Sequence, residues 1–145
     1  MLSTILVPTD GSADIDAPLK AALAVAKKSG GKIIALTVAN ELPIDPQANT
    51  MPASEWEKYQ RYMRGEATKN LVTVTDAAAA AGVPCETVVE QSDDAAACIL
   101  EVAARKECDA IFMASHRKSK LTQLFVGSST QKVLAHAKVP VMVFR

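Results

Sequence analysis

The chain has 145 residues, and its 16 basic and 16 acidic side chains balance to a formal net charge of zero. This length fits one domain with one hydrophobic core, and the balanced charge disfavours nucleic acid or an acidic membrane as a partner. No apolar run approaches the roughly 20 residues that a membrane helix requires, and no signal-peptide pattern follows Met1. We therefore expect a single cytoplasmic domain over residues 1–145.

The first part of the chain predicts two strands separated by a helix. Residues 3–8 (STILVP) form a continuous apolar run, which is typical of a strand buried on both faces of a parallel sheet. An apolar helical stripe covers residues 15–26, and the Gly30-Gly31 pair ends that helix. Residues 32–39 (KIIALTVA) give the second strand, and an irregular loop with three prolines follows over residues 40–52.

A long helix is predicted from Ser54 to the glycine at position 82. Ser54 and Glu57 have the spacing of a capping box at its start, and Gly82 is a typical end. Apolar residues at helical spacing predict a single buried stripe along this helix, with Tyr62 lying off it. The stripe consists of Trp56, Tyr59, Met63, Ala67, Leu71, Val74, Ala78 and Ala81.

The last part of the chain predicts three more strands with two helices between them. Residues 84–90 (PCETVVE) and 109–114 (DAIFMA) form the third and fourth strands, and a helix capped by Ser92 separates them. A final helix over residues 129–137 leads into the fifth strand, VPVMVF, at residues 139–144.

The three cysteines, Cys85, Cys98 and Cys108, have neither the spacing of a metal site nor a CxxC pattern. We expect them to be small, buried apolar side chains. A redox role for one of them is the alternative.

Strands that alternate with helices predict an α/β domain with right-handed crossovers and a parallel sheet covered by helices on both faces. For five strands we expect an open, Rossmann-like sheet in the order 3-2-1-4-5. Ligands in such sheets bind beyond the carboxyl ends of the strands, where the strand order reverses. Here the reversal lies between the first and the fourth strands.

Two loops should therefore face each other across one crevice. The first strand ends in Pro8-Thr9-Asp10-Gly11-Ser12, and the fourth ends in Met113-Ala114-Ser115-His116. Asp10 could accept hydrogen bonds from a base or a ribose, or it could cap the first helix, and its position at the reversal point favours ligand contact.

A second candidate feature opens the last helix. Gly127-Ser128-Ser129-Thr130 supplies a glycine and three hydroxyls at a helix N-terminus, which is a suitable place for an anion, although the same residues also make an ordinary helix start. No GxGxxG, Walker or GxSxG pattern is present, so dinucleotide binding, P-loop chemistry and serine-hydrolase catalysis have no support from the sequence.

With both features in view, the whole chain resembles the universal stress protein (UspA) family. The resemblance is carried by ILVPTDGS at residues 5–12 and by GSSTQKVLAHAKVPVMVFR at residues 127–145. It implies the fold of the adenine nucleotide alpha hydrolase-like proteins. The ATP-binding branch of this family has a motif of Gly, two residues, Gly, nine residues, Gly, then Ser or Thr. The spacing is kept here, but Ala114 and Arg117 replace the first two glycines.

By this resemblance, Pro8, Thr9, Asp10 and Val38 would surround adenine and ribose, and residues 127–130 would face the phosphates. Ala114 adds one methyl to the motif. Arg117 would strain a left-handed backbone by about 1–2 kcal/mol and could reach into the phosphate channel, or it could hold phosphate directly. The candidate nucleotide-binding residues are Pro8, Thr9, Asp10, Val38, Met113, Ala114, Ser115, Arg117, Gly127, Ser128, Ser129 and Thr130.

Two functions follow as hypotheses. The first is a non-catalytic stress-response protein that acts as a dimer with an unknown protein partner and has a weakened or altered adenine-nucleotide site. The second is a protein switched by ATP, with Mg²⁺, or by AMP, with slow ATP hydrolysis at most. In both cases we expect a homodimer through residues 139–144, because an apolar edge strand is hazardous when it is left open.

Overall fold

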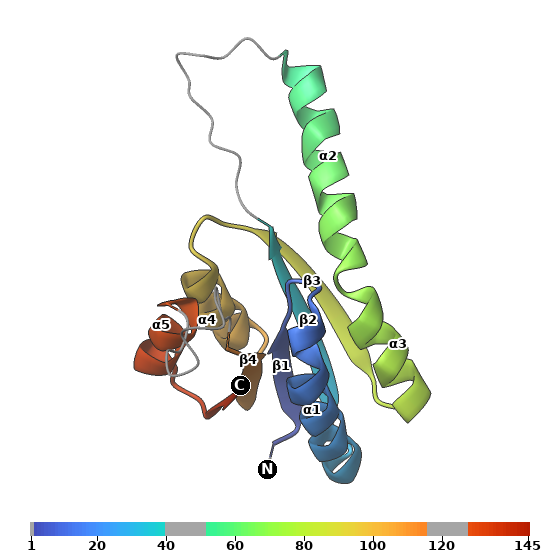
Figure 1. The fold of residues 1–145 in the computed structure, drawn as a ribbon, viewed down its shortest axis with the longest axis vertical. Helices are drawn as coiled ribbons and strands as arrows, with labels where there is room; N and C mark the ends of the chain where they lie inside the picture. Colours follow the sequence, from blue (N-terminus) through green and yellow to red (C-terminus); the bar gives the residue numbers. More distant parts are fainter. Residues whose placement is uncertain (1, 40–51, 116–127) are drawn as a thin grey trace.

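The computed structural model describes residues 2–39, 52–115 and 128–145. Its five-stranded parallel sheet has the strand order β3-β2-β1-β4-β5, as predicted (Figure 1). The strands are β1 (Thr4–Pro8), β2 (Lys32–Ala39), β3 (Cys85–Gln91), β4 (Ala110–Ala114) and β5 (Val141–Phe144).

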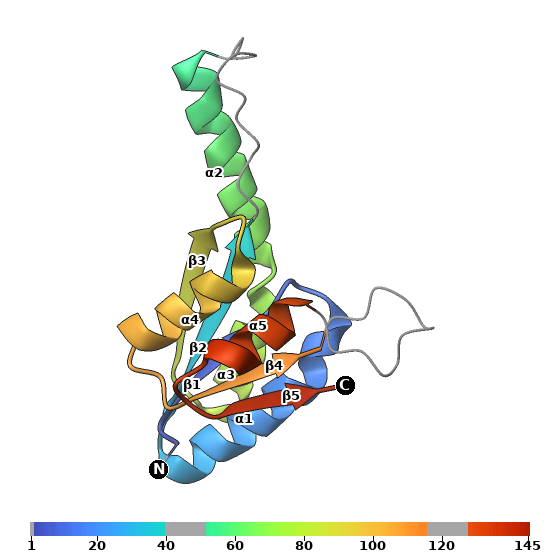
Figure 2. The ribbon, with the colours of Figure 1, turned by 90° about the vertical axis from the view of Figure 1, so that its left-hand side faces the viewer.

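Helices cover both faces of the sheet. After a short 3₁₀ turn, η1 (Ala13–Ile15), the helices are α1 (Asp16–Ser29), α2 (Ala53–Lys69), α3 (Val72–Ala81), α4 (Ala95–Arg105) and α5 (Ser128–His136). Helices α4 and α5 lie together on one side of the sheet, and α1 and α3 lie on the other (Figure 2). No described helix is both long and apolar enough to cross a membrane.

The core forms two layers because successive side chains of a strand point to opposite faces. Ile5 and Val7 of β1 pack into the cluster beneath α1 and α3, while Leu6 packs into the cluster beneath α4 and α5. All three side chains are fully buried. The continuous apolar run predicted for this strand is therefore explained by burial on both of its faces.

The loop between α1 and β2 needs both of its glycines. Gly30 ends α1 in the left-handed conformation, with φ of 66°. Gly31 lies against the chain just before β1: a Cβ atom at this position would be 1.9 Å from the carbonyl oxygen of Ser3. The predicted helix end at this pair is confirmed, and the second glycine allows β1 and β2 to meet.

The prediction of one helix over residues 54–82 is wrong, because Asn70 and Leu71 separate α2 from α3. The predicted stripe is buried only from Ala67 to Ala78. Trp56 and Tyr59, in the first part of α2, are only half-buried. That part of α2 extends past the end of the sheet (Figure 1), so no strand lies beneath it.

Two predicted helix caps also differ from the structure. The residue before α2 is Pro52, so Ser54 lies inside the helix and makes no capping bond. The cap of α4 is Asp94, whose carboxylate accepts a hydrogen bond from the backbone N–H of Ala97 at 3.1 Å. Ser92 instead accepts a bond from the N–H of Asp94, at 3.0 Å, and so orients the residue that does cap the helix.

Candidate functional site

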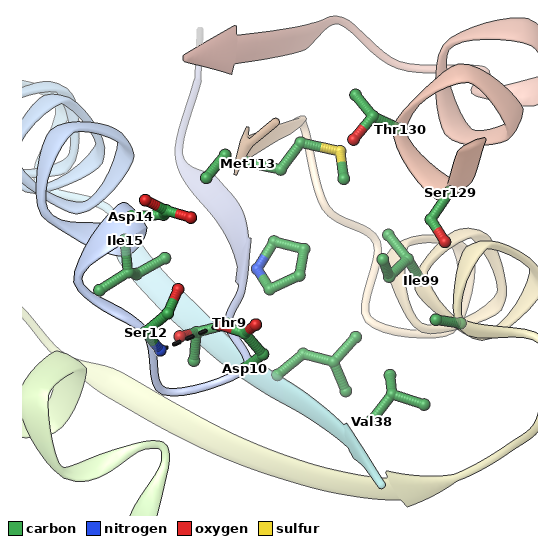
Figure 3. Close-up of a pocket in the computed structure, with 14 residues that line it drawn as sticks. Thr9, Asp10, Ser12, Asp14, Ile15, Val38, Ile99, Met113, Ser129 and Thr130 are labelled. Atoms are coloured by element: carbon green, nitrogen blue, oxygen red, sulfur yellow. Dashed lines mark hydrogen bonds between the residues drawn. The ribbon is translucent and has the colours of Figure 1, made fainter. Parts of the chain in front are cut away.

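The strand order reverses between β1 and β4, and a pocket opens beyond the carboxyl ends of these two strands. The pocket has a volume of about 120 Å³ and opens to solvent. Side chains from β1, β2, α4, β4 and α5 meet here (Figure 3). The described lining consists of Pro8, Thr9, Asp10, Ser12, Asp14, Ile15, Leu36, Val38, Ala95, Ile99, Met113, Ala114, Ser129 and Thr130.

The loop after β1 is held in shape by three hydrogen bonds from its own backbone. The N–H of Thr9 donates to the carbonyl of Leu36 on β2 at 2.8 Å. The N–H of Gly11 donates to the Thr9 hydroxyl at 3.0 Å, and the N–H of Ser12 donates to the Asp10 carboxylate at 2.9 Å. The loop is thus fixed before any ligand arrives, which reduces the ordering cost of binding.

Asp10 does not cap a helix. The residue before η1 is Ser12 and the residue before α1 is Ile15, and the Asp10 carboxylate bonds to the backbone within its own turn. The helix-cap alternative for this residue is therefore wrong. Asp10 is exposed at the pocket wall, where its carboxylate can accept hydrogen bonds from a ligand hydroxyl or amine.

The floor and sides of the pocket are apolar. Leu36 and Val38 lie two residues apart on β2 and so point to the same face. Met113 of β4 and Ile99 of α4 complete a surface on which a flat aromatic ring could rest (Figure 3). Apolar walls with a few fixed polar groups are the usual composition of a small-molecule site.

The side of the pocket opposite the Asp10 loop is formed by the first turns of two helices. Ala95 begins α4, while Ser129 and Thr130 lie in the first turn of α5. Helix N-termini carry partial positive charge and free N–H groups, so this side suits an anion. The Lys132 ammonium of α5 lies 3.6 Å from the Asp94 carboxylate of α4 and joins the two helix starts.

The capping bond at α4 has an electrostatic consequence. The N–H of Ala97, and secondarily the Lys132 ammonium, hold the pKa of the Asp94 carboxyl below its usual value, although partial desolvation opposes them. Asp94 is thus a carboxylate at neutral pH and offsets part of the positive field at the start of α4.

Most of the candidate residues predicted from the sequence meet in this pocket, and their binding of nucleotide stays a prediction. Pro8, Thr9, Asp10, Val38, Met113, Ala114, Ser129 and Thr130 all line it. Ser128 begins α5 but is not part of the described lining. Ser115 is buried and borders a neighbouring hollow beside Arg145. Arg117 and Gly127 lie outside the described residues, as do residues 40–51 of the loop predicted over residues 40–52.

The remaining lining residues were not predicted as site residues. Leu36 could have been found from Val38, because residues two apart on a strand share a face. Ala95 and Ile99 lie one helical turn apart and were assigned only to a helix. Ser12 belongs to the loop that was predicted to face the crevice, although it was not named as a site residue. Asp14 lies in the turn that leads into α1, and no local pattern indicates that it reaches the pocket.

The cysteines lie away from the pocket lining. Cys98 and Cys108 are buried, as predicted, whereas Cys85 is only half-buried. Burial raises the pKa of all three thiols, that of Cys108 to about 11, so they stay protonated at neutral pH. Within residues 2–39, 52–115 and 128–145, no three or more His, Cys, Asp or Glu side chains are grouped so that they could hold a metal ion.

A comparison with known protein families identifies the family of this chain. The model of the Universal stress protein family matches residues 1–145, which is the whole chain. The chain belongs to the universal stress protein family. A universal stress protein of Methanocaldococcus jannaschii is 28% identical over 141 residues, which cover 97% of this chain and 81% of that protein. A universal stress protein of Thermus aquaticus is 29% identical over 145 residues, the full length of both chains.

Solved structures, among them universal stress proteins, share the fold. A hypothetical protein whose biochemical function was assigned from its structure has a TM-score of 0.79 at 24% identity, covering 99% of this chain and 95% of that one. A universal stress protein in complex with cAMP has a TM-score of 0.69 at 21% identity, with 99% and 97% covered. A family member from Arabidopsis thaliana with AMP bound has a TM-score of 0.63 at 17% identity, with 98% and 90% covered.

Proposed function

We propose that this universal stress protein is a non-catalytic cytoplasmic regulator that acts as a homodimer and binds an adenine nucleotide in a site with altered phosphate contacts. The observation that carries the proposal is the polarity of the pocket between β1 and β4. A carboxylate and an apolar floor lie on one side, and two helix N-termini lie on the other. A nucleoside monophosphate has the matching sequence of groups: a flat base, ribose hydroxyls and an anion.

The relatives support adenine as the base. Universal stress proteins of the same fold have been solved with cAMP and with AMP. In this chain Val38 and Leu36 would contact the base, Asp10 would accept from a ribose hydroxyl or the base, and Ser129 and Thr130 would face the phosphate. Each of these residues lines the pocket.

The phosphate end is the part that we propose to be altered. Ala114 lies at the end of β4 and places a methyl group on the pocket wall, at the position of the first glycine in the ATP-binding motif that the sequence resembles. The Arg117 side chain adds a cation to the same motif. We expect the site to favour AMP, with little further affinity gained from the two outer phosphates of ATP.

Titration calorimetry with AMP, with ATP and Mg²⁺, and with GMP as a control tests the nucleotide proposal. A ligand at a hundred times its Kd adds about 2.7 kcal/mol to the free energy of unfolding, so thermal denaturation provides a second reading. Asp10→Ala should weaken AMP binding by about tenfold or more, the effect of losing a charged hydrogen bond. Asp16→Ala is the matched control, because Asp16 is exposed and lies outside the pocket. Absence of heat and of stabilisation with millimolar adenine nucleotides would refute the proposal.

A switch operated by ATP is the second candidate, and the pre-formed Asp10 loop together with the start of α5 favours it. Arg117→Gly separates the two possibilities. The variant should bind ATP more tightly than the wild type if the arginine blocks the phosphate channel, and more weakly if the arginine holds phosphate. Hydrolysis of ATP by the wild type above the uncatalysed rate would favour the switch over the non-catalytic regulator.

The dimer proposal rests on β5, which pairs with β4 on one side and forms the end of the sheet on the other. Met142 of this strand is 48% exposed, which is unusual for a large apolar side chain at a sheet edge. Met142→Lys should convert the dimer to a monomer in analytical ultracentrifugation. Val72→Lys is the matched control, because Val72 is 50% exposed but lies on α3. A monomeric wild type at micromolar concentration would contradict the proposal.

A further inference from the structure

The junction between α2 and α3 touches the loop that carries Asp10. Leu71, which is 2% exposed, anchors the junction in the core beneath α3. Its neighbour Asn70 is half-buried, and its side-chain amide faces the sheet. The Asn70 Nδ2 atom donates to the hydroxyl of Thr37 on β2, at 3.4 Å. Thr37 is itself only 1% exposed, and the bond is partly buried.

The other side of the Asn70 amide lies against Gly11. A Cβ atom built on Gly11 would be 2.5 Å from Oδ1 of Asn70 and 2.9 Å from its Cγ atom. The Gly11 backbone therefore packs directly on the amide group, with no room for a side chain between them. Gly11 has a φ of +86°, a conformation that residues with side chains rarely adopt, and it forms the corner of the turn from Thr9 to Ser12.

These two contacts connect the Asp10 turn with the strand that forms the floor of the candidate site. Gly11 follows Asp10 directly, and Thr37 lies between the two β2 residues that form the pocket floor, Leu36 and Val38. Asn70 is not part of the described pocket lining. We propose that Asn70 is a positioning residue: it holds the Asp10 turn at a fixed place relative to β2, and so sets the affinity for adenine nucleotide without touching the ligand.

This inference rests on the proposed nucleotide function and makes a separate prediction about the turn. Without the Asn70 amide, the turn loses its outer support and populates other conformations. The apparent affinity of a ligand falls by the same factor as the population of the competent conformation. Because coupling is reciprocal, a bound nucleotide should also steady the α2–α3 junction.

The test compares Asn70→Ala with the control Thr68→Ala. Thr68 lies two residues away on the exposed face of α2, where its hydroxyl donates to the carbonyl of Arg64. Amide hydrogen exchange followed by NMR reports on the turn through the N–H groups of Gly11 and Ser12. In Asn70→Ala these amides should exchange about tenfold faster, the factor expected when one supporting interaction is lost, whereas Thr68→Ala should leave them unchanged.

Calorimetry with AMP gives the second reading. Asn70→Ala should weaken AMP binding by about five- to tenfold, in line with a competent fraction reduced to between a fifth and a tenth. Asn70→Asp keeps the shape of the side chain and can accept a bond from the Thr37 hydroxyl, so it should retain slow exchange at Gly11 and Ser12. In the wild type, AMP should slow the exchange of the Asn70 and Leu71 amides.

The outcomes distinguish this inference from the proposed function. Unchanged AMP affinity in a folded Asn70→Ala variant would overturn the positioning role, as would equal exchange rates in Asn70→Ala and the wild type. A wild type that binds no adenine nucleotide would refute the proposed function, and the exchange rates of the Gly11 and Ser12 amides would still show whether Asn70 holds the turn.

Discussion

Replacing Gly31 with alanine should destabilise the fold through a steric clash with the backbone. The new Cβ atom would lie 1.9 Å from the carbonyl oxygen of Ser3, whereas ordinary contact begins at 3.4 Å, so about 1.5 Å of movement is needed. That carbonyl accepts the N–H of Lys32 at 2.7 Å, and the Ser3 N–H donates to the Asp109 carboxylate at 3.0 Å. Overpacking costs about 1–3 kcal/mol and each lost hydrogen bond about 1 kcal/mol, so we expect a loss of about 3–4 kcal/mol.

Urea unfolding followed by circular dichroism measures this loss, and two other glycines serve as controls. Gly30→Ala introduces a side chain at positive φ with nothing within 4 Å, so it should cost only about 1–2 kcal/mol. Gly65 lies inside α2 with nothing within 4 Å, and Gly65→Ala should stabilise the protein by up to about 1 kcal/mol. The reasoning fails if Gly31→Ala is tolerated as well as Gly30→Ala.

Two further predictions concern titrating groups. Asp94→Ala should lower the free energy of unfolding at neutral pH. The pKa of the Asp94 carboxyl is depressed in the folded state, so the wild type should gain its full advantage in unfolding free energy above pH 3.8. This advantage over the variant should disappear as the pH falls through the folded-state pKa, as measured by urea titrations at a series of pH values. Cys108, with a pKa of about 11 caused mainly by burial, should resist iodoacetamide at pH 8 in the native state and react once urea unfolds the chain; mass mapping that shows rapid native labelling would contradict its burial.

The strands could be predicted from the sequence because each one is marked by a local run of apolar residues. Every predicted strand is present, and the observed bounds of β1 and β4 differ from the predicted ones by a single residue. Runs such as ILV and AIFM are apolar on both faces because helices cover both sides of a parallel sheet. The strand order follows from general rules on crossover connections, which leave few alternatives for a five-stranded domain.

The break in the predicted long helix could not be read from periodicity. Ala67, Leu71, Val74 and Ala78 keep the helical spacing across the junction, so the apolar stripe gives no sign that α2 ends at Lys69. The cause is tertiary. Leu71 packs into the core, and Asn70 packs against a loop that is distant in sequence. A local pattern cannot report a contact of that kind.

The candidate site was predictable to the extent that residues lie at strand ends. Asp10 and Met113 follow from the point where strand order reverses, because parallel strands bring their carboxyl ends to one edge. Ala95 and Ile99 approach the pocket through the placement of α4 across the sheet, which is set by core packing. The role of Asn70 was still less predictable from the sequence, because its contacts depend on where two helices meet.

The two edges of the sheet differ in a way that bears on assembly. At one edge, β3 carries Glu86 and Glu90, and the Glu90 carboxylate lies 2.7 Å from the guanidinium of Arg105 on α4. Charged side chains on an edge strand oppose pairing with another chain. At the other edge, β5 has the sequence VMVF, with no charged residue between Val141 and Phe144. Of the two edge strands, β5 is the one without a charged side chain, and we therefore expect a second copy to pair there and not along β3.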